Sequence, residues 1–199
     1  MSIAIWVYMA AAAVATGLNF SVINTARDYA NDASLKQAFK DAIKPVDALG
    51  SIASLAELVI VITTAIWTYR TAKQIAYRGM VLRFTPVMCM FSWILPPVLF
   101  IFPMIVLRDF AAKTTIARND PTNRMQTLII QWWVLYGVLP LVMSFFGAAL
   151  SNAIPRSEQE LAKALSEQIV PNTVSALSLV AAAYLWRQIV VTMSRDIEI

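Results

Sequence analysis

Glu57 is the residue whose type and position most clearly suggest chemistry. It lies in an apolar run of the sequence, about eight residues or roughly 12 Å of helix from the start of that run. Ionisable groups within apolar spans are costly and are therefore functional candidates by default. Glu57 could be a proton or cation site, or a carboxylate that meets a base on a partner. The alternative is a protonated or hydrogen-bonded side chain packed against Ser51, Ser54, Gln131 or backbone.

Other kinds of chemistry find little support in the sequence. The chain has no histidine, so it offers no imidazole ligand for haem, chlorophyll or an ordinary metal site, and no common proton shuttle near neutral pH. Its five glycines are scattered and form no phosphate-binding loop. No base is placed to activate a serine nucleophile. We therefore expect no catalytic residues, no metal and no cofactor, and a protein that is not an enzyme.

The segment from Arg83 to Arg108 is apolar enough to enter a bilayer but carries Pro96, Pro97 and Pro103. Proline removes a backbone donor, and a broken helix at membrane depth survives only where it is buried against other protein. Residues 85–107 are therefore predicted to form a kinked or re-entrant helical hairpin.

The elements around this hairpin are apolar helices. The chain of 199 residues is 59% hydrophobic and 14% charged, far from the composition of soluble domains. Runs of about 20 apolar residues fall near 3–22, 49–69, 128–153 and 171–193, besides 85–107. The prediction is an all-α, polytopic membrane helical bundle that occupies residues 1–199 as a single transmembrane domain.

Charge alone allows two topologies. Five full crossings, and four crossings with a re-entrant hairpin, both place ten basic residues inside and six outside. Acidic residues favour the re-entrant form, in which the outer connections are net acidic, so we expect four spans plus the hairpin, with five spans as the alternative. In the preferred form we expect the inner connections to bind anionic lipid headgroups. Their basic residues are Arg70, Lys73, Arg78, Arg83, Arg108, Lys113, Arg118 and Arg124.

Both outer connections show helical spacing of apolar residues, which predicts surface helices near 32–44 and 158–169. Ser157 followed by Glu160 is a capping-box pattern, and Pro45 and Pro171 are expected to end the two helices.

Small residues four apart, Gly50 with Ser54 and Gly147 with Ser151, are typical of close helix contacts in membranes. Tryptophan and tyrosine residues near the span ends are typical of interfacial belts. They include Trp6, Tyr8, Trp67, Trp132, Trp133, Tyr136, Tyr184 and Trp186.

The proline spacing resembles a bacterial membrane family known as domain of unknown function 4328. The residues that carry the resemblance are Pro86, Trp93, Pro96 and Pro103, preceded by Arg78 and Arg83. The chain departs from the family pattern at Val87, Leu99 and Phe102. The resemblance covers roughly residues 50–195 and implies a fold and a bacterial membrane setting, but no activity.

These observations lead to two functional expectations. The first is a non-catalytic accessory or assembly subunit in the bacterial inner membrane that packs against a larger complex, with respiratory or photosynthetic complexes as one setting. The second is a small transporter or ion pathway that uses Glu57 and the proline hairpin. Membrane lipids and a larger membrane protein are the expected partners, and nucleic acid is not.

Overall fold

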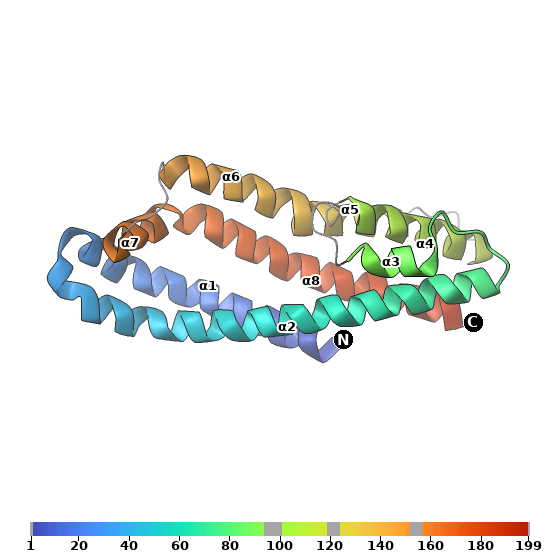
Figure 1. The fold of residues 1–199 in the computed structure, drawn as a ribbon, viewed down its shortest axis with the longest axis horizontal. Helices are drawn as coiled ribbons and strands as arrows, with labels where there is room; N and C mark the ends of the chain where they lie inside the picture. The colour runs from blue at the N-terminus through green and yellow to red at the C-terminus, as the bar shows by residue number, and fades with distance from the viewer. Residues whose placement is uncertain (1, 94–100, 119–123, 152–156, 199) are drawn as a thin grey trace.

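The structure is a computed structural model that describes residues 2–93, 101–118, 124–151 and 157–198. The eight α-helices of these residues are α1 (Ser2–Asn31), α2 (Lys36–Tyr77), α3 (Pro86–Phe91), α4 (Phe102–Arg118), α5 (Arg124–Trp133), α6 (Leu139–Ser151), α7 (Glu158–Glu167) and α8 (Ile169–Glu198) (Figure 1). A 3-10 turn at Ala33–Leu35 precedes α2, and a π-helical segment at Val134–Val138 joins α5 to α6. The prediction of an all-α fold is confirmed.

Among the described residues, four helical stretches are long and apolar enough to cross a membrane, so the chain is a multi-pass membrane protein. They are Ile3–Asn31, Ala33–Tyr77, Arg124–Ala149 and Ile169–Arg195. The 42 residues of α2 alone measure about 63 Å, twice the roughly 30 Å of a hydrocarbon core, so α2 extends beyond the membrane.

The two connections expected outside meet at one end of the bundle, which we call the α7 end (Figure 1). The ammonium nitrogen of Lys36, at the start of α2, lies 2.7 Å from a carboxylate oxygen of Glu158 in α7. The hydroxyl of Tyr29, in α1, donates to the same carboxylate at 3.4 Å. Five full crossings would put these two connections on opposite sides of the membrane. The contact therefore excludes the five-span alternative.

The proline segment contributes α3 and α4, which lie at the opposite end, where α2 ends and α5 begins (Figure 1). The backbone N–H of Arg83, before α3, donates to a carboxylate oxygen of Asp109, in α4, at 2.8 Å. The segment thus leaves and returns at the same end, as a re-entrant hairpin does. Pro96 and Pro97 lie outside the described residues.

Two prolines of this segment start helices instead of kinking them. Pro86 is the first residue of α3, where its missing N–H would have no helical partner, and Thr85 caps the same turn by accepting from the N–H of Met88. Pro103 lies in the first turn of α4 and is fully buried.

The prediction of a separate surface helix near 32–44, ended by Pro45, is wrong. The chain continues through Pro45 as α2. One proline removes a single backbone hydrogen bond, and packing outweighs that loss here. Phe39, one and a half turns earlier, stacks on Tyr29 of α1 with ring centroids 5.1 Å apart.

The second surface helix is present as α7, and the N–H of Glu160 donates to the hydroxyl of Ser157 at 3.2 Å, as the capping pattern predicted. Ala162 is fully buried on this helix, and Leu161 is 46% exposed. Pro171 lies in the first turn of α8, where its missing N–H costs no helical hydrogen bond, and so does not end α7.

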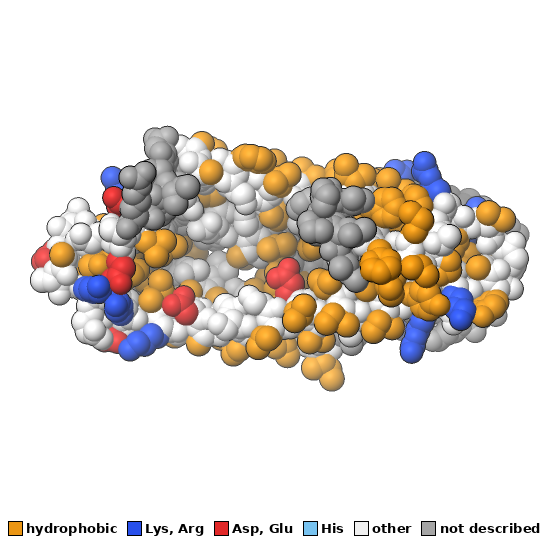
Figure 2. Space-filling view, in the orientation of Figure 1, with side chains coloured by type: hydrophobic (Ala, Val, Ile, Leu, Met, Phe, Trp, Pro, Cys, Tyr) orange, Lys and Arg blue, Asp and Glu red, His pale blue; other side chains and the backbone are white. Residues whose placement is uncertain are grey.

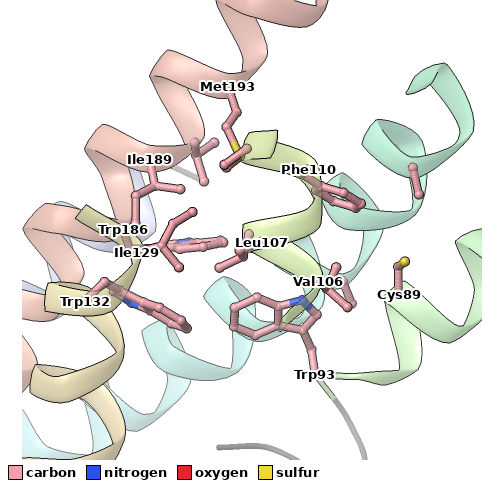
Figure 3. Packing of buried hydrophobic residues seen from close by; sticks show 14 of the residues in the cluster. Cys89, Trp93, Val106, Leu107, Phe110, Ile129, Trp132, Trp186, Ile189 and Met193 are labelled. Atoms are coloured by element: carbon pink, nitrogen blue, oxygen red, sulfur yellow. The ribbon is translucent and has the colours of Figure 1, made fainter. Parts of the chain in front are cut away.

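The buried apolar residues of the described parts of the chain form two clusters. The larger joins α1, α2, α3, α4, α5 and α8 (Figure 3) and includes Cys89, Val106, Leu107, Phe110, Ile129, Ile189 and Met193. The smaller, at the α7 end, consists of Val22, Ala26, Tyr29, Phe39 and Ala162. Charged side chains gather at the two ends of the bundle, and the end opposite α7, which we call the basic end, shows mainly lysine and arginine (Figure 2).

Candidate functional site

A small cavity of about 60 Å³ opens beside α2, within the span. Its walls come from α1, α2, α5, the π-helical segment and α8, together with Trp93, which lies just beyond the end of α3. The polar and aromatic side chains that line it are Tyr8, Glu57, Thr64, Trp93, Trp132, Tyr136 and Trp186, and the aliphatic ones are Ile60, Val61, Leu179 and Ala183. We call it the aromatic pocket.

Three tryptophans from separate parts of the chain form one wall of the aromatic pocket, and Figure 3 shows them close to one another. The ring centroid of Trp186 lies 5.0 Å from that of Trp93 and 5.3 Å from that of Trp132. Tyr136 stacks on Trp132 at 5.2 Å, with 10° between the ring planes. Such aromatic pairs contribute about 0.5–1.5 kcal/mol each beyond area burial, which fixes the wall in place.

The π-helical segment Val134–Val138 positions Tyr136. Pro140 has no N–H to donate to the carbonyl of Tyr136, and its ring crowds that carbonyl in an α-helix. The backbone instead widens, and the N–H of Leu139 bonds to the carbonyl of Val134, five residues earlier. Short π-helical insertions of this kind are frequent at functional sites.

Glu57 is exposed at the mouth of the aromatic pocket. Among the described residues, no hydrogen bond or ion pair reaches its carboxyl group, and the hydroxyl of Ser51 donates to the backbone of Asp47. The predicted alternative, in which Glu57 is hydrogen-bonded to a neighbouring side chain or to backbone, is therefore not seen among the described residues.

Towards the α7 end, α2 carries a polar, small-residue stripe on one face. Its members Asp47, Gly50, Ser51 and Ser54 follow helical spacing, line an open groove together with Val46 and Leu55, and are exposed or partly exposed. A Cβ atom added at Gly50 would meet no other atom within 4 Å. We call these four residues the α2 stripe. Figure 2 shows a hollow beside α2, near the middle of the face of the molecule that it displays.

The second predicted small-residue contact is used inside the chain. A Cβ atom at Gly147, in α6, would lie 3.6 Å from the ring of Pro171 and 3.7 Å from the side chain of Gln168. The side chain of Ser151 lies outside the described residues.

The basic residues expected to bind lipid headgroups lie on α2, the connection after it, α4 and the start of α5. Some make internal contacts: the Arg108 guanidinium donates to the Gln126 amide at 3.0 Å, and the Lys73 ammonium lies 5.7 Å from the ring centre of Tyr77. Lipid binding stays a prediction, and the side chain of Arg118 lies outside the described residues. In the described parts of the chain, no cluster of three acidic or cysteine side chains could hold a metal ion.

The aromatic pocket is the feature that sequence reasoning missed. Trp132 and Trp186, predicted to lie in interfacial belts, are each only 3% exposed, whereas Trp6 is 51% exposed. The spacing of Trp132 and Tyr136, one helical turn apart, was the available signal, because such a pair presents two rings on one face.

Comparison with protein families decides what kind of chain this is. The model of the DUF4328 family, described as a domain of unknown function, matches residues 30–194. The chain belongs to the DUF4328 family. In this member, the family motif residue Trp93 is a wall of the aromatic pocket, and Pro86 and Pro103 open α3 and α4. Comparisons with curated proteins and with solved structures gave no match.

Proposed function

We propose that this DUF4328 protein is a non-catalytic accessory subunit that packs against a larger complex in the bacterial inner membrane. The α2 stripe carries the proposal. It presents one carboxylate, two hydroxyls and a glycine on an exposed face of a spanning helix. Polar groups facing hydrocarbon are costly, and small residues allow a second helix to approach closely. A transmembrane helix of a larger protein, laid along the α2 stripe, would bury both features.

The orientation we propose places the basic end in the cytoplasm. The connections there carry Arg70, Lys73, Arg78, Arg83, Arg108 and Lys113, and the positive-inside tendency favours the cytoplasmic side for such loops. These residues would then face anionic headgroups of the inner leaflet, which attract each nearby lysine or arginine by about 1 kcal/mol.

A matched pair of glycine variants tests the partner surface. Gly50, in the α2 stripe, and Gly17, in α1, both have open space where a Cβ would lie. The tagged chain is extracted in mild detergent, and the copurifying proteins are measured by mass spectrometry. We expect Gly50→Leu to lose larger stoichiometric partners that wild type and Gly17→Leu retain. Equal recovery with both variants would remove the α2 stripe as the partner surface, and a wild-type chain without larger partners would remove the accessory role.

One observation favours a second function, a small transporter or ion pathway: Glu57 lies within a span without an ionic partner among the described residues. A pathway through this carboxylate requires its charge. Glu57→Gln should then abolish cation flux into vesicles that contain the purified chain, and unchanged flux would exclude a route through Glu57.

A further inference from the structure

The aromatic pocket has the composition of a binding site for an organic cation. One carboxylate, Glu57, stands at its mouth, and five aromatic side chains line it: Tyr8, Trp93, Trp132, Tyr136 and Trp186. From these residues we infer that the aromatic pocket binds a small alkylated ammonium group. This site goes beyond the accessory role, because it needs no partner protein.

Charge is the first argument. No lysine or arginine lines the pocket, and no ion pair reaches Glu57 among the described residues. A carboxylate near hydrocarbon is stabilised when a cation stands beside it, because the attraction is strong where the dielectric constant is low. The pocket therefore favours a ligand of positive charge.

The walls select the class of cation. Tryptophan and tyrosine faces attract ammonium groups, and aromatic cages around quaternary ammonium groups are the characteristic use of this interaction. Calcium, magnesium and similar ions need about six oxygen ligands. The aromatic pocket offers one carboxylate, two phenols and the Thr64 hydroxyl, so the walls suit alkyl groups better than a bare metal ion.

Size and placement limit the ligand further. A volume of about 60 Å³ holds a few water-sized groups, which is room for the methyl groups of a small ammonium head. Glu57 is exposed on the flank of α2, among the exposed apolar residues Leu58 and Val59. An alkyl chain on the ammonium group would therefore extend into lipid.

Binding of tetramethylammonium to the purified chain in maltoside detergent, measured by calorimetry and tryptophan fluorescence, tests the site. We expect saturable binding in wild type, weakened about tenfold or more in Glu57→Gln. Tert-butanol, a neutral molecule of similar shape, should bind at least about tenfold more weakly to wild type, and this comparison needs no variant. Glu167→Gln, which changes an exposed carboxylate on α7, is the matched control and should bind like wild type.

Three results with the wild-type chain would overturn the inference. They are no saturable tetramethylammonium binding in wild type, equal affinity for tert-butanol, and competition by potassium ions at the same concentration as the organic cation. Glu57→Gln with wild-type affinity and an unchanged melting temperature would also contradict it. Loss of copurifying partners in the glycine experiment bears only on the accessory role, so the two proposals fail separately.

Discussion

Lys36 and Glu158, which are 122 positions apart in the sequence, form an ion pair with 2.7 Å between the ammonium nitrogen and a carboxylate oxygen. A second lysine, Lys40, approaches the other oxygen at 3.5 Å. The pair ties the α1–α2 connection to α7 and closes the α7 end of the bundle. Its two side chains are each 50% exposed, so its effect on stability is modest and depends on pH and salt.

The pH dependence of this pair has a definite sign. The hydrogen bond and charge of Lys36 lower the pKa of the Glu158 carboxyl group. The stability that the pair adds to the fold is therefore fully present above the unfolded-state pKa of about 4.3. It is lost as the pH falls through the lower folded-state pKa of Glu158. We expect Glu158→Gln to lower the melting temperature by roughly 1–2 °C at pH 7 and to lie closer to wild type at pH 3.

Thermal unfolding in detergent at the two pH values measures this effect. Glu167→Gln is the control, because its carboxylate lies 4.0 Å from Lys163 of the same short helix and joins no separate elements. A larger difference between Glu158→Gln and wild type at pH 3 than at pH 7 would contradict the assigned sign.

Phe110 tests the core at the basic end. Its side chain, on α4, is fully buried in the larger cluster. Phe110→Ala leaves a cavity and should destabilise the bundle by about 3–5 kcal/mol. Phe145, in α6, is 70% exposed, so Phe145→Ala should leave the fold unchanged. The temperature at which each purified variant aggregates gives the comparison. An equal fall of this temperature in both variants would show that Phe110 is not a core residue.

Gly147 tests the contact of α6 with the start of α8. The distances of 3.6 and 3.7 Å are ordinary contacts for a methyl group but leave no room for more. Gly147→Ala should fold normally, and Gly147→Leu should lose about 1–3 kcal/mol through overpacking. Gly50→Leu is the control, since its side chain enters open space. Stability is measured by the same aggregation assay. If Gly147→Leu were as stable as wild type, α6 and the start of α8 would have to lie farther apart than they do in this structure.

Much of the fold follows from hydropathy. The four spans were predictable because each needs about 20 apolar residues, and the capping of α7 by Ser157 was predictable because it depends on neighbours in the sequence. The number of crossings was not decided by charge. Contacts between distant residues decide it, namely Lys36 with Glu158 and Arg83 with Asp109.

The candidate site was less predictable. Local rules gave Pro45 as a helix end, but α2 continues because Phe39 packs on Tyr29 across the bundle. Trp132 and Trp186 have the composition of an interfacial belt, and only their mutual contact at 5.3 Å reveals an internal wall. Glu57 was found from sequence because a carboxylate in an apolar span stands out, whereas its aromatic neighbours come from five other segments.

The most direct test of the four-span bundle is labelling of single cysteines in intact cells with a membrane-impermeant maleimide. Lys44→Cys and Arg124→Cys, both exposed, are each placed in a Cys89→Ala background that carries no other thiol. The account predicts that only Lys44→Cys is labelled before permeabilisation and that both are labelled after it. Protection of both in intact cells, or labelling of both, would put the two positions on one side of the membrane and contradict the four-span bundle.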